Sequence, residues 1–381
     1  MLDEVGGPAG YVLWLLLNDC GLWIAAEPRA ALFAPGGREW AQDAWPAELV
    51  DAFSILRAAS AAPELARAPD LAAAAASAWE WAERQGHLET AVQFAELAAR
   101  LEPESSARAG TAGRLCRRRG GLHARAACWF QRASRLARLQ GDEIAFATAR
   151  LGWGMLEFNH GNFLHAEAHF TKGYRSAMRV GRRSLAGSAK HNVMAVYIAS
   201  ERYTEARVHA WDAVRMYAAH HPALPRLAHD VAFMLSGEGY SASALPIFEK
   251  TLGFFTGGVE RMSVLASLAR AAAVARDRLR FERAAVEACA MTECTPGGES
   301  VLYQLAEGAR CFEQWDRAGA WADRALELAT ANGNKSVVRL AGDLLAALSA
   351  REMAPAGEIP ESGGPVDQLV DLVLRRLKKH T

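Results

Sequence analysis

The chain has 381 residues, a formal net charge of zero and a hydrophobic content of 51%, much of it alanine. This length is enough for a helical array with terminal additions, and the composition suits packed helices while leaving little room for a β domain. Zero net charge also counts against a protein whose whole surface binds nucleic acid, because such proteins carry a basic balance.

Residues 1–70 are predicted to form a helical N-terminal cap. They contain an apolar helix from about Gly10 to Ala26 and, after a Pro/Gly break, a second helix near Pro46 to Ala59. The apolar run Tyr11–Leu17 is too short to span a bilayer, which needs about 20 residues. Two acidic residues precede it where a secretory signal would carry basic ones. Terminal repeats must differ from inner ones to stay soluble, so we interpret this region as a cap. The alternative is a partner-docking or dimer surface, because tryptophan is favoured at interfaces.

From about residue 71 to 331 one phrase recurs: a turn, an aromatic residue or Leu, then small, bulky and small residues at helical spacing. Its first small residue is always alanine, at positions Ala91, Ala126, Ala166, Ala206, Ala244, Ala284 and Ala318. The intervals are 35, 40, 40, 38, 40 and 34 residues, a period that indicates an array of helical hairpins. Alanine suits these positions because two paired helices must approach closely where Leu would overpack.

Two further features recur in phase with these marker alanines. Glycines stand where the first helix of a hairpin must stop, as left-handed terminators do: Gly86, Gly121, Gly161 and Gly239. Bulky residues of the second helix are predicted to fill the gap to the next hairpin: Phe130, Phe170 and Phe248.

With these features the chain resembles the tetratricopeptide repeat family. The small–bulky–small second helix, the glycine turns, Pro103 at the end of the first repeat and the pair Trp153–Gly154 carry the resemblance. Several repeats exceed the family's usual length, as in long-repeat bacterial regulators and adaptors. The resemblance implies an all-α, right-handed superhelical solenoid of about seven helix-turn-helix repeats over residues 71–331. It also implies a concave groove, lined by the first helices, in which the ligand lies.

Spacing from the marker alanines places ten candidate partner-binding residues in this groove: Arg108, Arg118, Arg119, Phe158, Asn159, His191, Asn192, Arg226, His229 and Asp230. Asn192 and Arg226 fall where chaperone-tail-binding members of the family carry clamp residues for a terminal carboxylate. Asp230, however, stands where those members carry a base. The mixture therefore fits an internal peptide better, with the Asn192 amide satisfying backbone groups through its donor and acceptor sides.

Charge is unevenly distributed along the chain. Residues 1–104 carry 16 acidic and 6 basic residues, a balance of −10, whereas residues 105–220 carry 7 acidic and 19 basic residues, a balance of +12. No acidic residue occurs from 105 to 141 or from 168 to 200. One interpretation is a solvated face paired with the acidic N-terminal region. The other is a site for an anionic partner, an acidic or phosphorylated peptide or, less favoured, nucleic acid.

The C-terminal region is predicted to hold a capping helix within 332–353, a flexible Pro/Gly/Ser linker at 354–365 and an amphipathic helix at 366–381. The helix carries an apolar stripe: Val366, Leu369, Val370, Val373 and Leu377. We interpret it as folded back on the array. A tethered partner-binding helix is the first alternative, and a membrane-surface helix is the less favoured one.

No motif in the sequence indicates catalysis. His220 and His221 are separated from His229 and Asp230 by a proline turn, without a metal-binding pattern such as H-E-x-x-H, and no G-x-S-x-G occurs. The six cysteines form no C-x-x-C and are predicted to be buried, reduced thiols. We therefore predict a cytoplasmic, non-catalytic adaptor or regulatory subunit without metal or cofactor, which binds a protein or peptide. The alternatives are a signal-sensing regulator of a separate DNA-binding or effector partner, and nucleic-acid binding through the Arg-rich repeats.

Overall fold

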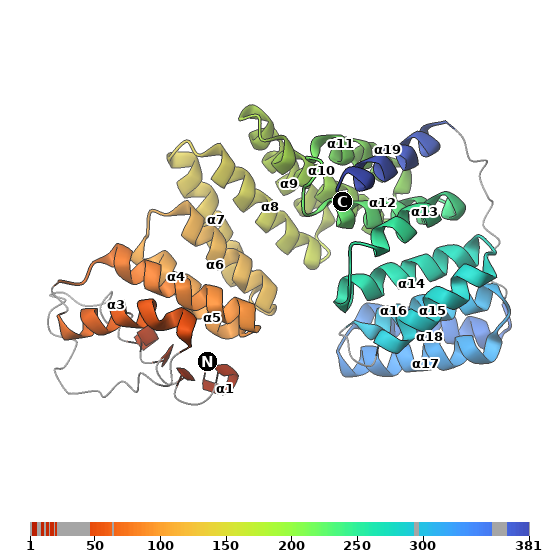
Figure 1. Ribbon diagram of the computed structural model, residues 1–381, viewed down its shortest axis with the longest axis horizontal. Coiled ribbons are helices and arrows are strands. Elements are labelled where there is room, and N and C mark those ends of the chain that lie inside the picture. Colours follow the sequence, from red (N-terminus) through yellow and green to blue (C-terminus); the bar gives the residue numbers. More distant parts are fainter. Residues whose placement is uncertain are drawn as a thin grey trace. The chain divides into compact units, whose positions relative to one another are not determined.

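The computed structural model describes residues 2–5, 9–10, 13–14, 16–18, 20, 46–62, 65–292, 297–352 and 364–380 (Figure 1). Every element in this part of the chain is helical, which confirms the predicted all-α class. The predicted apolar helix from Gly10 to Ala26 and the predicted linker at 354–365 lie largely outside the described residues.

The chain divides into two compact units, residues 1–189 and 190–381, each with its own apolar core. The division falls inside α10 (Arg183–Ala199), within the region predicted as one array. The first unit contains α1 (Leu2–Val5), η3 (Ala47–Leu49), α3 (Val50–Ala61), α4 (Ala68–Gln85), α5 (Leu88–Leu101), α6 (Ser106–Arg119), α7 (His123–Leu139), α8 (Glu143–Asn159) and α9 (Phe163–Arg179). The second contains α11 (Tyr203–Met216), α12 (Leu224–Gly237), α13 (Ser241–Leu252), α14 (Gly258–Val274), α15 (Arg278–Met291), α16 (Gly298–Cys311), α17 (Trp315–Ala331), α18 (Lys335–Ser349) and α19 (Pro365–His380).

Consecutive helices joined by short turns pack against each other as hairpins (Figure 1). The pairs are α4/α5, α6/α7 and α8/α9 in the first unit, and α12/α13, α14/α15 and α16/α17 in the second. All seven marker alanines are buried, and none is more than 4% exposed. Their burial confirms that the small residues lie at helix contacts, where a larger side chain would force the helices apart.

The turn glycines adopt the left-handed conformation that the sequence predicts. Gly86 ends α4 with φ +82°, and the backbone N–H of His87 donates to the Ala82 carbonyl at 2.8 Å. This bond satisfies a carbonyl that the helix end would otherwise leave free, and it needs a residue without Cβ at the turn. Gly121, Gly161 and Gly239 also have positive φ.

The bulky residues of the second helices pack against glycines of the first helices. The Phe130 ring lies against Gly113 of its own hairpin and Gly152 of the next, so that a Cβ at Gly152 would overlap the ring. The Phe170 ring lies over Gly154 of its own hairpin, where a Cβ would likewise overlap the ring. Phe130 thus bridges consecutive hairpins as predicted, and the rings explain why glycine occurs in the middle of α8.

We expect Gly154→Ala to lower the free energy of unfolding by about 1–3 kcal/mol, the usual cost of overpacking. The added Cβ would lie 2.5 Å from Cε1 of Phe170. Urea unfolding followed by circular dichroism measures the change. Gly319→Ala in α17 is the matched control: nothing lies within 4 Å of its added Cβ, so it should be neutral or stabilising by up to about 1 kcal/mol. Equal stability of the two variants would contradict the prediction.

The cysteines only partly follow the predicted burial. Cys20, Cys116 and Cys311 are buried free thiols, and Cys289 is half-buried. The prediction is wrong for Cys128, which is exposed on α7 because the repeat places it on the outer face of that helix. Cys294 lies outside the described residues.

The C-terminal helix α19 packs on α11, α12 and α13 in the second unit (Figure 1). Val366, Leu369, Val373 and Leu377 of its apolar stripe are at most 2% exposed. These contacts agree with the interpretation of a helix folded back on the array. Among the described residues, no helix has the length and apolar character needed to cross a membrane.

Candidate functional site

Three of the predicted partner-binding residues meet in one hydrogen-bonded chain in the second unit. His191 of α10 and His229 of α12 both contact the Asp230 carboxylate, with Nε2 of His191 2.8 Å from Oδ2 and Nδ1 of His229 2.9 Å from Oδ1. Nε2 of His229 lies 3.2 Å from Oγ of Ser267 on α14. His191, His229 and Ser267 come together because each is about one repeat from the next, so that the same face of successive first helices carries them, and Asp230 directly follows His229.

Donors and acceptors match throughout this hydrogen-bonded network of side chains. If each imidazole donates its N–H to Asp230, its other ring nitrogen carries no proton and can accept a hydrogen bond. The Ser267 hydroxyl provides this donor for His229, and the Tyr217 hydroxyl, 3.3 Å from Nδ1 of His191, provides it for His191. Burial by itself would raise the pKa of Asp230, but the hydrogen bonds from both histidines outweigh it and hold that pKa well below its ordinary value. The carboxylate is therefore charged and fully engaged at neutral pH.

The order Ser267–His229–Asp230 has the connectivity of a catalytic triad, but its surroundings do not suit nucleophilic attack. Ser267 is only 4% exposed, and it lies inside α14, where backbone N–H groups are used by the helix. A hydrolytic serine needs access to substrate and free N–H donors for the developing oxyanion. We therefore interpret the hydrogen-bonded network around Asp230 as a rigid support. In the part of the chain that the structure describes, no group of three or more His, Cys, Asp or Glu side chains has an arrangement that could hold a metal ion.

Asn192 and Arg226 lie next to this support and keep their hydrogen-bonding groups unused. Asn192 follows His191 on α10 and is half-buried, and Arg226 is exposed on α12. Neither makes a side-chain hydrogen bond or ion pair to any described residue. The neighbouring side chains are thus fixed, whereas these two are available to a ligand.

The arginines predicted in the second repeat are instead paired with glutamates of the first. Arg108 Nε lies 2.9 Å from Glu102, Arg119 Nε lies 2.9 Å from Glu89, and Arg118 pairs with Glu83. The carboxylates come from α4, α5 and the turn after α5, so the acidic first repeat neutralises much of the basic second one. A partner-binding role for these arginines stays a prediction, and less free positive charge is left here for nucleic acid.

Phe158 and Asn159 lie at the end of α8. The Phe158 ring packs on Phe163 across the turn, with ring centroids 5.7 Å apart, and Asn159 is exposed. Phe158 thus helps to close a hairpin, and the role predicted for both residues in partner binding is untested.

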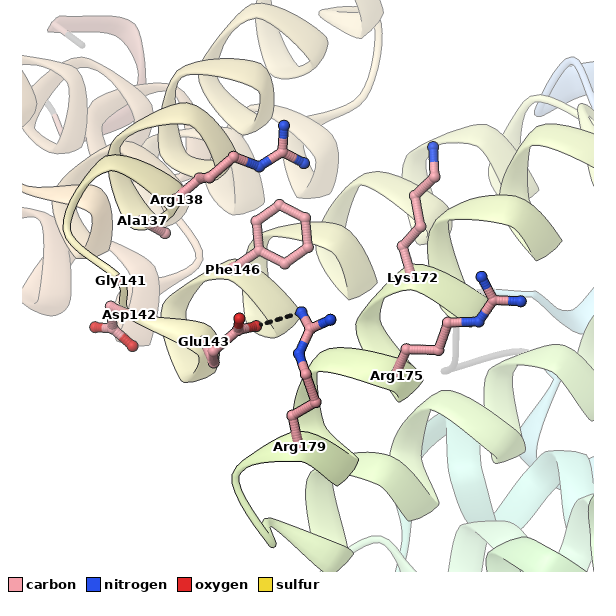
Figure 2. Close-up of a pocket in the computed structure, with 9 residues that line it drawn as sticks. All are labelled: Ala137, Arg138, Gly141, Asp142, Glu143, Phe146, Lys172, Arg175 and Arg179. Atoms are coloured by element: carbon pink, nitrogen blue, oxygen red, sulfur yellow. Dashed lines mark hydrogen bonds and ion pairs between the residues drawn. The ribbon is translucent and has the colours of Figure 1, made fainter.

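A basic pocket between α7, α8 and α9 was not predicted residue by residue (Figure 2). Its volume is about 290 Å³, and its lining residues are Ala137, Arg138, Gly141, Asp142, Glu143, Phe146, Lys172, Arg175 and Arg179. The sequence did carry a signal for it. Lys172, Arg175 and Arg179 are spaced i, i+3 and i+7 within an acid-free stretch, which places them on one face of α9.

Beside this pocket, His169 is held in its neutral form. Burial and the charges of Arg150 and Lys172 lower its pKa to about 4, while its ring packs on Trp153 with centroids 4.4 Å apart. The Arg150 guanidinium lies 3.1 Å from Nδ1, which accepts its proton in the neutral ring.

Acid should therefore destabilise the wild type partly through His169. A histidine whose pKa falls on folding contributes stability above its ordinary pKa of 6.5, and this is lost as pH falls toward about 4. The full loss is roughly 3 kcal/mol at about 1.4 kcal/mol per pKa unit. We expect the His169→Gln variant to lose less stability than the wild type in this pH range, as measured by urea unfolding at several pH values. Parallel pH curves would contradict this.

A comparison with protein-family models finds no match, and a search of curated proteins by sequence finds none either. Among solved structures, the chain is similar to aspartyl phosphate phosphatase F from Bacillus subtilis, with 12% identity, coverage of 92% of this chain and 97% of that chain, and a TM-score of 0.51. The chain has a tetratricopeptide-like repeat fold. A Rap protein complexed with competence and sporulation factor (10% identity, 86% and 99% coverage, TM-score 0.49) and yeast Tom70 (13% identity, 88% and 70% coverage, TM-score 0.46) are also similar.

These identities show the fold alone. The right-handed superhelix and the number of seven repeats remain predictions.

Proposed function

We propose that the protein is a non-catalytic adaptor or regulatory subunit that binds an extended segment of a partner protein along the first helices of its second unit. The observation that carries the proposal is the contrast between the fixed chain His191–Asp230–His229–Ser267 and the unused side chains of Asn192 and Arg226 beside it. Binding sites commonly combine a rigid platform with a few polar groups that stay free for the ligand.

Each free side chain suits a different part of a peptide. The Asn192 amide can donate to a backbone carbonyl and accept from a backbone N–H, which favours an extended segment whose own groups are unpaired. The Arg226 guanidinium offers a planar fork for a carboxylate, so that an acidic residue of the partner is expected near it. Asp230 does not oppose such a residue strongly, because two imidazole N–H groups already face its charge.

Site-specific photo-crosslinking in cells tests this proposal. A benzophenone amino acid is placed at Asn192 in the full chain and, as the control, at Val208, which is 61% exposed on the second helix α11. We expect a defined protein adduct from position 192 that is absent from position 208. Arg226→Glu in the same chain should weaken that adduct at least tenfold. An adduct pattern that is the same at both positions, or unaffected by Arg226→Glu, would reject the groove of the second unit as the binding site.

A further inference from the structure

We propose that the pocket between α7, α8 and α9 binds a phosphate monoester. Four basic side chains line it, two acidic residues lie at its edge, and the Phe146 ring forms part of its wall (Figure 2). A volume of about 290 Å³ has room for a phosphoryl group and for the side chain or small alcohol that carries it. The pocket belongs to the first unit, so the proposal does not depend on peptide binding at Asn192 and Arg226.

The two acidic residues of the pocket are already engaged. Asp142 caps α8, because its Oδ1 accepts from the backbone N–H groups of Ile144 and Ala145 at 3.0 and 2.9 Å. Glu143 accepts from Nη2 of Arg179 at 2.8 Å and also from the Ser176 hydroxyl. The Arg179 hydrogen bond is the main cause of a lowered Glu143 pKa. Figure 2 shows Arg179 directed at Glu143.

The other three bases have no such partner. Arg138, Lys172 and Arg175 make no ion pair with any described carboxylate, and all three are exposed. Their charges are therefore concentrated around the pocket without an ion-pair partner of their own, and the two acidic residues balance only part of the positive charge. A solvent-facing cavity with an excess of one charge attracts ions of the opposite sign.

A second sign of uncompensated charge lies behind Phe146. The guanidinium groups of Arg138 and Arg150 each lie 5.1 Å from the centroid of the Phe146 ring. Burial, followed by repulsion from Arg138, lowers the pKa of Arg150, and the Arg150 Nε is buried without a hydrogen-bond partner. Like charges are thus held close together around one ring. An anion at the mouth of the pocket would offset their repulsion.

The number and spread of these cations favour a phosphate monoester over a single carboxylate. A phosphoryl group carries a charge of about −1.5 to −2 at neutral pH and offers three strong acceptor oxygens. Three unpaired bases from two helices supply charge and donors for more than one oxygen, and the Arg138 guanidinium is a fork that suits two acceptor oxygens. A carboxylate would neutralise only one of them. The phosphate could belong to a phosphorylated residue of a partner protein or to a small phosphate ester.

Isothermal titration calorimetry on the full chain at constant ionic strength tests the proposal with four probes. They are inorganic phosphate, O-phosphoserine, a short alanine-based peptide with a central phosphoserine, and the same peptide with glutamate. The pocket variant is Lys172→Ala with Arg175→Ala. The matched control is Arg283→Ala with Lys335→Ala, which removes the same two side-chain types from exposed positions of the second unit. Thermal unfolding and circular dichroism establish that both variants are folded.

For each phosphate probe, we expect the wild type and the control variant to have the same affinity. The pocket variant should bind that probe at least tenfold more weakly. A phosphopeptide that binds more than tenfold tighter than inorganic phosphate and O-phosphoserine would identify a partner protein as the source. Equal binding of these probes would identify a small phosphate compound. The proposal is overturned if no phosphate probe binds, if the pocket variant binds as well as the control, or if the glutamate peptide binds as tightly as the phosphopeptide. These outcomes leave the crosslinking result at Asn192 unaffected.

Discussion

Replacing Asp230 by alanine is expected to lower the free energy of unfolding by about 2–5 kcal/mol, because each buried N–H left without an acceptor costs about 1–3 kcal/mol. His191 is only 7% exposed, and its Nε2 would lose its partner at 2.8 Å. His229 would lose the bond that orients its ring toward Ser267. Urea unfolding at neutral pH measures the loss. Asp323→Ala, at an exposed position inside α17, should change stability by less than about 0.5 kcal/mol.

The pH dependence of this loss separates the charge of Asp230 from simple packing. The pKa of Asp230 is lower in the folded chain than its ordinary value of 3.8, so its contribution is present above that value and is lost as pH falls below it. The stability difference between wild type and Asp230→Ala should therefore be constant near neutral pH and shrink below about pH 4. A difference that does not change with pH would contradict a charged, hydrogen-bonded carboxylate at this position.

The sequence predicted the repeat architecture well because the features that specify it are local and steric. A marker alanine such as Ala126 must be small wherever two helices touch, and a turn glycine such as Gly86 must accept positive φ. Both requirements recur once per repeat, so weak signals add up in phase. The glycines under the phenylalanine rings follow the same logic, although only Gly154 belongs to the pattern that carries the family resemblance.

The site was harder to predict because it depends on which side chains meet across repeats. Glu83 and Arg118 are 35 residues apart, which equals the interval between the first two marker alanines. The repeat interval alone therefore predicts that these two side chains form an ion pair, in which the charge of Arg118 is neutralised. The hydrogen-bonded network around Asp230 also includes Tyr217, at the end of α11. No position of the repeat specifies a tyrosine there. Charge balance within a pocket likewise depends on how exposed side chains turn, as for Arg138 and Lys172.

Leu369→Asp is expected to detach α19 from the second unit. Leu369 is completely buried in the middle of the apolar stripe, between α19 and the helices α11 to α13. A carboxylate at this place would lose its hydration without gaining a partner, which costs more than exposing the helix. The second unit would then lose the burial of the stripe, worth about 1.5–3 kcal/mol for each Val or Leu before the entropy of the released helix is subtracted.

Hydrogen exchange followed by mass spectrometry measures the detachment. In Leu369→Asp, amides of α19 should exchange at the rate of an isolated helix, and amides of α13 should lose protection. Gln368→Asp is the matched control, since it adds the same charge one residue away on the exposed face of the helix. Its exchange pattern should equal that of the wild type.

The polar contacts at the other end of α19 cannot hold the helix once the stripe is broken. Arg376 donates to the Arg215 carbonyl at 3.3 Å, and His380 Nδ1 lies 3.1 Å from the Ala219 carbonyl. Bonds of this kind contribute only about 0.5–1.5 kcal/mol each, and water can replace them. If α19 of Leu369→Asp stayed protected, these terminal bonds and the ring contact of His380 with Phe254 would have to dominate docking. We expect the apolar stripe to dominate docking instead. Arg376→Ala should therefore leave α19 protected from exchange, because the four buried apolar side chains remain in place.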